Sequence, residues 1–407
     1  MGQSRPRSWR RTAFQFLVSQ CVTLFGSTLV QMAIVWYVTL NTASGAWVAA
    51  FSVCSYLPQF LLSFAGGVFA DRYSRKWLIA GADAAIAAVT LLMILVIPHI
   101  RETETLLSAL LLISALRSAG AGIQTPAVSA VIPSLVPETE LMRFNGLNAA
   151  MQSLVNFAAP AAAGALLTVS SLRLTMGIDV LTAVAGIGMV LGIRIPGNDE
   201  KKRLSAWEDL KMEIGCVRGH REVGNLLTVY GLFTILCVPA GFLAGLLVSR
   251  VYGDDYWYLT AVELVGFAGM VAGGLLMSVW GGCSNRRTTL AAALGVFGAM
   301  AAGMGIVKSF VLYLLLMGLY GVALTAVQTA VTTMVQEGTP AAVQGRVFGL
   351  MSSVYSGCLP LGMAVFGPLA DLIPLQGIMI FSGAALLALA FMVYDGGNGG
   401  RRQRRRG

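Results

Sequence analysis

Residues 67–76 have the sequence GVFADRYSRK and lie between two long apolar stretches of the chain. One acid, Asp71, and three bases, Arg72, Arg75 and Lys76, are crowded into this short turn. Such a turn is typical of a membrane surface, where basic residues stay on the cytoplasmic side and pair with helix ends. Gly67 at its start predicts that two helices approach each other closely there.

The composition predicts an integral membrane protein. Hydrophobic residues make up 56% of the chain and charged residues only 12%, which is too little charge for a soluble protein. Apolar runs long enough to cross a bilayer fall into two groups of six. They cover 14–40, 46–70, 78–98, 105–132, 143–168 and 174–195, then 223–249, 256–281, 289–307, 310–335, 346–372 and 376–394. We therefore expect an all-α protein with twelve transmembrane helices.

The placement of positive charge predicts the orientation in the membrane. With twelve spans, both termini lie on the same side, and the loops and tails of that side hold 22 Lys and Arg residues. The opposite loops hold four, namely Arg101, Arg173, Arg250 and Lys308. Because cytoplasmic loops carry the excess of basic residues, both termini are expected in the cytoplasm. The expected location is the plasma membrane or inner membrane of the cell.

The two halves of the sequence repeat each other. From Arg143 and Arg346 onward, matching residues keep one constant offset, which pairs Gly146 with Gly349, Ser153 with Ser356, Gly164 with Gly367 and Leu166 with Leu369. The repeat predicts two pseudo-symmetric six-helix bundles. We place the N-terminal bundle at 1–195, a cytoplasmic linker with an amphipathic helix at 196–222, the C-terminal bundle at 223–394, and a disordered basic cytoplasmic tail at 395–407.

The turn at 67–76 resembles the loop that joins the second and third helices in the major facilitator superfamily, with Ser74 in place of the usual glycine. Several further motifs resemble the macrolide-efflux and siderophore-export branch of that superfamily: Arg117-Ser118-Ala119-Gly120, Thr125-Pro126-Ala127, Phe144-Asn145-Gly146-Leu147-Asn148 and Gly367-Pro368-Leu369-Ala370-Asp371. Pro160 with Gly164 resembles the helix-packing antiporter motif of the fifth helix, with Ala159 in place of a glycine. The resemblance implies a secondary transporter that works by alternating access.

Charged residues inside spans are the candidates for coupling transport to protons, because an unpaired charge there is costly. Glu263, in the external half of the eighth span, is the first candidate for a proton-carrying carboxylate, with a structural ion pair as the alternative. Asp83 and Asp179 lie near span ends, where a helix cap or a contact with the interface is the expected role. Arg117 lies in the middle of the fourth span and must face water or a carboxylate.

Neutral polar residues inside spans are candidates for lining a substrate cavity, with interhelical hydrogen bonding as the alternative for each. The set comprises Gln31, Gln124, Gln152, Asn156, Gln328 and Tyr355. The turn residues Gly67, Asp71, Arg72, Arg75 and Lys76 are assigned to a cytoplasmic gate.

Other classes of function find little support in the sequence. His99 and His220 stand apart from any acid or thiol cluster, and the six cysteines are scattered singly, so neither a metal site nor an enzyme's catalytic cluster is expected. The chain has no phosphate-binding glycine-rich motif, and we expect no cofactor. The net charge of +9 follows from the orientation rule and does not call for nucleic acid.

The sequence therefore predicts a monomeric, proton-coupled exporter of bulky hydrophobic or amphiphilic organic compounds, such as macrolide-like drugs or siderophores. Two alternatives remain open. One is an importer of a small solute with the same fold, and the other is a membrane receptor or assembly factor that transports nothing.

Overall fold

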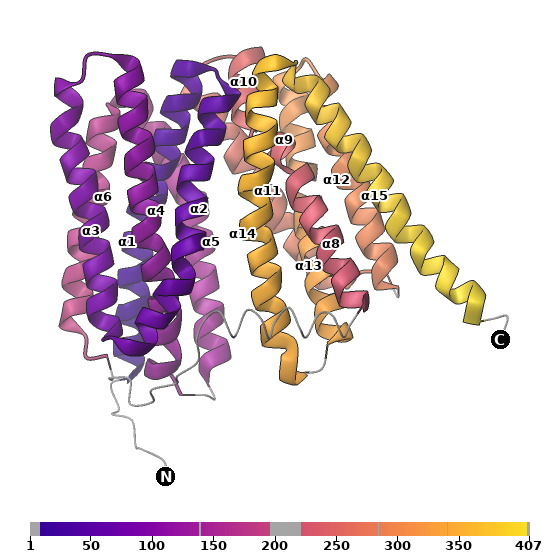
Figure 1. The fold of residues 1–407 in the computed structure, drawn as a ribbon, viewed down its shortest axis with the longest axis horizontal. Helices are drawn as coiled ribbons and strands as arrows, with labels where there is room; N and C mark the ends of the chain where they lie inside the picture. Colours follow the sequence, from indigo (N-terminus) through magenta and orange to yellow (C-terminus); the bar gives the residue numbers. More distant parts are fainter. Residues whose placement is uncertain (1–8, 138–139, 196–220, 284, 340, 405–407) are drawn as a thin grey trace, which may run out of the picture. The chain divides into compact units, whose positions relative to one another are not determined.

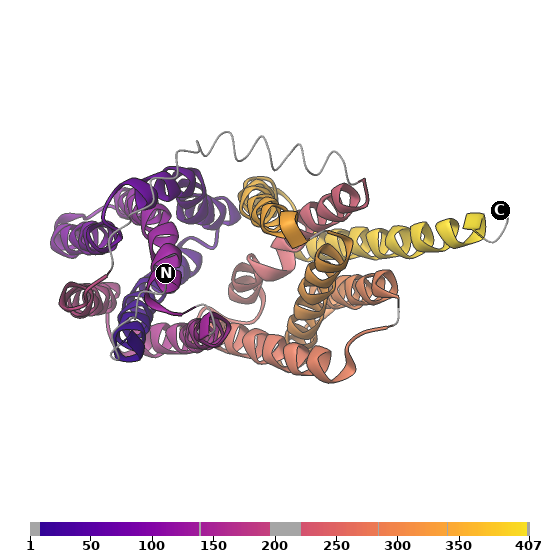
Figure 2. The same ribbon diagram turned by 90° about the horizontal axis from the view of Figure 1, so that it is seen from below.

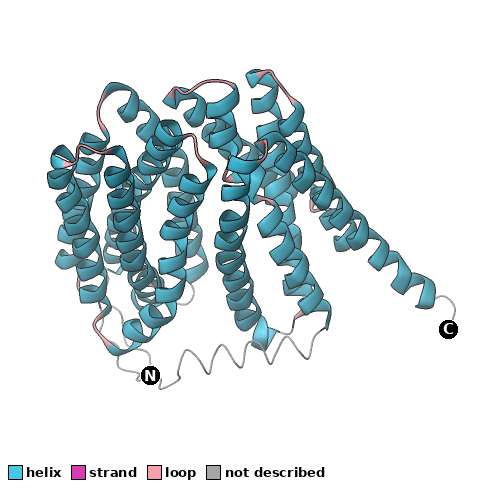
Figure 3. Ribbon diagram, turned by 45° about the horizontal axis from the view of Figure 1, so that its top comes forward, coloured by secondary structure: helices cyan, strands magenta, loops and turns pink. Residues whose placement is uncertain are grey.

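The computed structural model describes residues 9–137, 140–195, 221–283, 285–339 and 341–404. Those residues are helical apart from short turns, and no strand is drawn among them in Figure 3. The first half contains α1 (Trp9–Thr42), α2 (Gly45–Arg72), α3 (Arg75–Val96), η1 (Ile97–His99), α4 (Thr103–Leu135), α5 (Leu141–Val169) and α6 (Leu172–Gly192). The second contains α8 (Arg221–Leu236), α9 (Val238–Gly241), α10 (Ala244–Val251), α11 (Tyr256–Trp280), α12 (Arg286–Ile306), α13 (Phe310–Gly338), α14 (Ala341–Leu372) and α15 (Leu375–Arg404).

The helices of the described residues provide twelve segments that are long and apolar enough to cross a membrane. Within a bilayer no water is available to the backbone, and a helix satisfies its peptide groups internally. Within each half of the chain, consecutive spans are joined by short connections (Figure 1). The expected twelve-helix, all-α membrane architecture is confirmed.

Two compact units divide the chain. Unit 1 consists of Met1–Val38 and Phe51–Glu208, and unit 2 of Thr39–Ala50 and Asp209–Gly407. The division falls inside the predicted linker, whose expected amphipathic helix lies outside the described residues. One segment differs from the predicted bundles. Residues 39–50, which comprise the end of α1, the turn and the start of α2, are grouped with unit 2 and bind side chains of α10 and α14.

The internal repeat is visible in the helix packing of each unit. In unit 1, α3 packs against α4 and α6; in unit 2, α12 packs in the same way against α13 and α15 (Figure 2). These are the helices that the sequence repeat makes equivalent. In unit 2 the backbones of α12 and α15 meet at two glycines, since a Cβ at Gly298 would lie 2.7 Å from the carbonyl oxygen of Gly383.

The seventh predicted span is broken into three helices. The sequence predicted one segment at 223–249, but α8 ends at Leu236, the single turn α9 follows, and α10 begins at Ala244. Pro239 lacks an N–H donor and stands in the first turn of α9, where that donor is not needed. The Leu243 N–H then reaches back to the Val238 carbonyl over five residues instead of four (3.2 Å). Discontinuous spans of this kind are tolerated where surrounding protein satisfies the backbone.

The prediction of a disordered tail at 395–407 is wrong for most of that segment, because α15 runs without a break from Leu375 to Arg404. The run of glycines after Asp395 suggested a helix end, but no proline follows it and no residue there requires a left-handed backbone. A left-handed glycine does end α11, where Gly281 has φ 69°.

Candidate transport site

The basic turn at 72–76 binds helix ends in unit 1. Arg75 donates hydrogen bonds to the carbonyl oxygens of Ala70 in α2 (3.3 Å) and Ala130 in α4 (2.9 Å). Lys76 Nζ donates to the carbonyl oxygens of Leu191 and Ile193, 2.6 and 2.8 Å away at the end of α6. Ala70, Leu191 and Ile193 lie at the ends of their helices, where carbonyls lack intrahelical partners and a cation is favoured by the helix dipole, whereas Ala130 lies five residues before the end of α4.

Gly67 is not the point of close helix approach that the sequence predicted. A Cβ added to Gly67 meets no atom within 4 Å, whereas one added to Gly66 would lie 2.9 Å from the Ile123 Cα of α4. Successive residues of a helix point about 100° apart, so Gly66 and Gly67 lie on different faces of α2. Arg72 is exposed, and the side chain of Asp71 lies outside the described part of the structure.

A buried ion pair occupies the interior of unit 1. The guanidinium of Arg117 in α4 is paired with the carboxylate of Asp179 in α6, and the two side chains are only 8% and 3% exposed. The Thr90 hydroxyl in α3 donates to the same carboxylate (3.0 Å), and Arg117 also donates to the Ser27 hydroxyl of α1 (3.1 Å). Arg117 thus meets a carboxylate, one of the two environments expected for it.

Asp83 is a second buried acid in unit 1, and no cation pairs with it among the described residues. Its Oδ1 accepts a hydrogen bond from the Gln124 amide of α4 (2.6 Å), while its Oδ2 is buried with no hydrogen-bond partner in the described structure. Asp83 and Asp179 are 4% and 2% exposed. The expectation that both act as helix caps or reach the interface is therefore wrong, because each lies inside its helix and faces the protein interior.

Both acids line a polar cavity of about 260 Å³ in unit 1. Three of the predicted cavity residues, Gln31, Gln124 and Gln152, lie in its wall. Further polar residues of the wall are Gln20, Thr23, Ser27, Thr28, Gln59, Thr125, Ser129 and Asn148. With two carboxylates, and Arg117 bound to one of them, the cluster holds one negative charge in excess if all three groups are ionised.

The other predicted cavity residues do not join this wall. Asn156 and Gln328 are exposed on α5 and α13, and Tyr355 of α14 stacks on Tyr230 of α8 with ring centroids 6.4 Å apart. Pro160 and Gly164, the predicted packing motif, are both buried within α5.

Gln59 is a cavity residue that the sequence analysis missed, and a neighbouring proline positions it. Pro58 interrupts the helical hydrogen bonds of α2. The Ser118 hydroxyl of α4 bridges the break, since it accepts from the Gln59 N–H (3.0 Å) and donates to the Ser55 carbonyl (2.7 Å). Pro58 in an otherwise apolar span was the available signal, because prolines in spans are tolerated where a serine or threonine can satisfy the freed backbone.

Glu263, the first candidate for proton coupling, lies in unit 2 and is not among the residues that line the unit 1 cavity. It is partly buried in α11, close enough to the hydroxyl groups of Tyr313 and Tyr320 to interact with them electrostatically. The Tyr313 side chain is fully buried, and its hydroxyl has no hydrogen-bond partner in the described structure. Glu263 therefore lies near the hydroxyl groups of two tyrosines.

Asp371 forms a polar cluster within unit 2 that the sequence analysis did not assign. Its carboxylate accepts hydrogen bonds from the Ser44 hydroxyl (2.7 Å) and from the backbone N–H groups of Gly45 (2.6 Å) and Ala46 (2.9 Å), at the first turn of α2. Arg250 pairs with the carboxylate (2.7 Å) and donates to the Ala43 carbonyl (2.6 Å). An acid at a helix N-terminus satisfies orphan N–H groups and is favoured by the helix dipole.

Twelve candidate spans, an internal repeat of helix packing and a charged cavity among membrane-crossing helices together define the chain as a multi-pass transport protein of the repeat-built type. Residues 16–363 match the family model described as Major Facilitator Superfamily, and the chain belongs to this family. No group of three or more potential metal-ligating side chains occurs in the described part of the chain.

Named relatives include drug-efflux proteins. The chain is 28% identical over 390 residues to Macrolide efflux protein A of Streptococcus pyogenes, with 95% of this chain and 96% of that protein covered. It is 23% identical to Multidrug efflux pump Tap of Mycobacterium bovis, with 94% and 91% covered. A crystal structure of a mutant of the nucleoside transporter NupG has the same fold, with a TM-score of 0.73 at 14% identity over 94% of this chain and 99% of that one.

Proposed function

We propose that the protein exports bulky, largely apolar organic compounds such as macrolides in exchange for protons. The observation that carries the proposal is the buried cluster of Asp83, Asp179 and Arg117 beside a polar cavity in unit 1. An unpaired carboxylate in a membrane interior is costly unless it binds a proton or another cation. Relatives named for macrolide and multidrug efflux favour export over import.

Asp83 is assigned the proton-binding role, because one of its oxygens is buried without a partner. Asp179 is held by Arg117 and Thr90. Arg117 cannot lose its charge, so it acts as a fixed counter-ion. Gln124 donates a hydrogen bond to Asp83, and both residues line the cavity. Glu263 is kept as a second candidate acid.

The cavity of unit 1 accommodates part of a bulky substrate. Its volume of about 260 Å³ lies below the range of about 300–1,000 Å³ usual for drug-sized ligands. A protonated amine on the substrate would fit the excess negative charge. Competition between that amine and a proton for one carboxylate supplies the exchange.

The turn at 71–76 is assigned to a cytoplasmic gate. The protein is placed in the plasma membrane or inner membrane, with both termini in the cytoplasm. Arg75 binds the end of α2 and the Ala130 carbonyl of α4, and Lys76 binds the end of α6, so that the two residues tie these helices together. A rigid end on unit 1 lets its helices move as one body during alternating access. We expect the protein to act as a monomer.

The test is accumulation of a macrolide and of a lipophilic fluorescent dye in cells that express the protein. Wild type should lower accumulation, and a protonophore should abolish the effect. Asp83→Asn should abolish the reduced accumulation as well. Glu263→Gln, which removes one acid from unit 2 in the same way, tests the second candidate acid. Export that persists in Asp83→Asn and is lost in Glu263→Gln would move the proton site to unit 2.

The polar wall of the cavity also favours a second candidate, import of a small polar solute by the same fold. Eleven neutral polar side chains and two acids fit a small hydrogen-bonding solute better than an apolar drug. The accumulation assay separates the two, because an importer leaves macrolide and dye levels unchanged. Uptake of labelled nucleosides and sugars into the same cells then provides the positive result for import.

A further inference from the structure

Helix α5 presents a row of amide side chains along one side. Asn145, Asn148, Gln152 and Asn156 follow each other at intervals of three or four residues. With about 100° per residue they fall within an arc of about 80°, and the row is about 17 Å long. Asn145, Gln152 and Asn156 are exposed, and Asn148 is partly buried. Within the part of the chain that the structure describes, none of the four side chains has a hydrogen-bond partner.

The amide row differs from the other two faces of the same helix. Val155 is buried, and Phe144 packs against the core of unit 1. Leu147 and Leu154 are exposed, and they lie about 140–160° around the helix from Gln152. A spanning helix with exposed leucines on one side and exposed amides on another contacts hydrocarbon with the leucines.

The position of Asn156 sets how deep the row reaches into the membrane. Asn156 is the midpoint of the 27-residue span Arg143–Val169. Lipid head groups do not reach the middle of a hydrocarbon core about 30 Å thick. Polar side chains inside a membrane are costly unless they face water, protein or a ligand. The row therefore borders a space that is not lipid, from near the start of α5 to the middle of the span.

The internal repeat indicates that helix packing does not require these amides. The constant offset from Arg143 and Arg346 pairs the four amide positions with apolar or aromatic residues of α14. These residues are Phe348, Met351, Tyr355 and Leu359. Leu359 is buried, and Tyr355 stacks on Tyr230. The equivalent face of unit 2 is thus covered and lacks amides.

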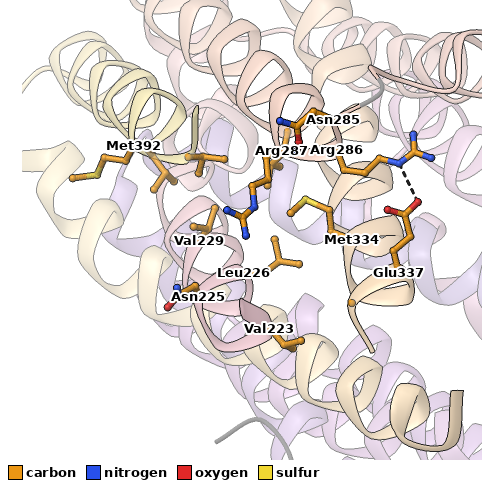
Figure 4. Close-up of a pocket in the computed structure, with 14 residues that line it drawn as sticks. Val223, Asn225, Leu226, Val229, Asn285, Arg286, Arg287, Met334, Glu337 and Met392 are labelled. Carbon is orange, nitrogen blue, oxygen red and sulfur yellow. Dashed lines mark hydrogen bonds and ion pairs between the residues drawn. The ribbon is translucent and has the colours of Figure 1, made fainter. Parts of the chain in front are cut away.

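The polar groups of a cavity in unit 2 provide a contrast with the amide row. This cavity has a volume of about 680 Å³ (Figure 4). Its apolar wall includes Leu226, Val229 and Met334. Arg286 pairs there with the Glu337 carboxylate (3.1 Å), and Asn285 caps α12. These three side chains are engaged by the protein, whereas the amides of α5 keep their donors and acceptors available to a ligand.

The amide row is continuous with the cavity of unit 1, because Asn148 and Gln152 line that cavity as well. The cavity accommodates part of a bulky substrate, so the remainder needs a surface beside it. A side-chain amide donates through its NH₂ group and accepts through its carbonyl oxygen. A row of amides therefore suits one edge of a molecule that carries hydroxyl, ether and ester oxygens.

We propose that the amide row of α5 binds the oxygen-rich edge of the exported compound, on its way from the cytoplasmic end of α5 to the cavity of unit 1. This role rests on the proposed function and adds a substrate class to it. The favoured substrates are amphiphiles with several oxygen atoms along one edge and an apolar remainder.

Binding of erythromycin, a macrolide rich in oxygen, to the purified protein by isothermal titration calorimetry tests this role. Asn156→Leu keeps the branched shape of the side chain and removes its hydrogen-bonding atoms. It should raise the Kd about two- to tenfold, which corresponds to one lost neutral hydrogen bond. Gln152→Leu/Asn156→Leu should weaken binding further. Leu154→Ala changes an exposed apolar residue on another face of α5 and should leave the Kd unchanged.

Two further measurements separate substrate binding from a structural role. The melting temperature of Asn156→Leu should not fall, because the amide has no partner in the described structure. Tetraphenylphosphonium is a bulky apolar cation without hydrogen-bonding atoms, and its binding should be the same in wild type and Asn156→Leu, whether measurable or absent.

The outcomes distinguish the amide row from the proposed function. Unchanged erythromycin binding in the double variant, or equal weakening of both compounds by Asn156→Leu, would overturn the role of the row alone. A lower melting temperature of Asn156→Leu would also overturn it, in favour of a contact between helices or between copies of the chain. Wild type that binds neither compound would refute the proposed function itself, and the role of the row with it.

Discussion

Replacing Arg117 by glutamine is expected to destabilise unit 1 strongly. In the variant the Asp179 carboxylate, which is 3% exposed, loses its cation and keeps the hydrogen bond from the Thr90 hydroxyl. Removing one partner of a buried ion pair costs about 3–5 kcal/mol, because the other charge stays buried without compensation. For a unit of roughly 200 residues, 1 kcal/mol shifts the melting temperature by about 2–4 °C. We therefore expect the melting temperature to fall by about 6–20 °C.

Thermal unfolding of the purified protein, followed by size-exclusion chromatography of heated samples, measures this effect. The double variant Arg117→Gln/Asp179→Asn removes both charges and should recover most of the lost stability. Arg173→Gln, which removes a charge from an exposed position at the start of α6, serves as the control. The reasoning is refuted if the double variant is destabilised by the sum of the two single effects, because an ion pair predicts strong coupling between them.

Two further predictions concern helix contacts and a third concerns the cytoplasmic turn. Gly66→Ala should lower the melting temperature while Gly67→Ala leaves it unchanged, because only the first added Cβ meets the backbone of α4; equal melting temperatures would contradict the assigned contact. Asp371→Ala should cost about 2 kcal/mol in thermal unfolding, as expected for a lost N-cap and a partly exposed ion pair, with a smaller loss for Arg250→Gln; a larger loss for Arg250→Gln would place the main contribution elsewhere. Asp71→Asn should slow transport more than it weakens substrate binding, and normal transport rates in that variant would remove the gating assignment.

The fold could be predicted almost entirely from the sequence, because a membrane restricts spanning segments to helices and their apolar lengths are visible in the chain. The prediction failed where the local pattern of apolar residues and glycines did not match the helix ends. The break at Pro239 is hidden within a continuous apolar run from Val223 to Val251. Helix α15 continues through a glycine-rich stretch that predicted its end.

The residue types of the candidate site could be predicted from the sequence, but the contacts between those residues could not. Acids and amides inside spans were identified, but Asp83 and Asp179 were expected at helix ends because only their distance from the span boundaries was visible. Rotation of a helix decides whether such a residue faces lipid, the interface or the interior, and packing sets that rotation. For the same reason Gly66, and not its neighbour Gly67, makes the contact with α4.

The internal repeat indicates that the charged cluster belongs to the first unit alone. Helices α3 and α12 both begin at a basic pair, Arg75-Lys76 and Arg286-Arg287, and this alignment places Leu294 at the position of Asp83. The constant offset from Arg143 and Arg346 makes α6 and α15 begin at equivalent leucines and places Ser382 at the position of Asp179.

The alignment of Gln124 with Gln328 likewise places Gly321 at the position of Arg117. Leu294 and Ser382 are fully buried, and Gly321 packs against the backbone of α11, so each position keeps its place in the core and has no charge. The same helix packing therefore exists in both units without the ions, and packing alone does not require them. A buried ion pair adds little net stability compared with well-packed apolar residues. This comparison therefore supports the proposal that the charges of unit 1 bind a proton or a cation.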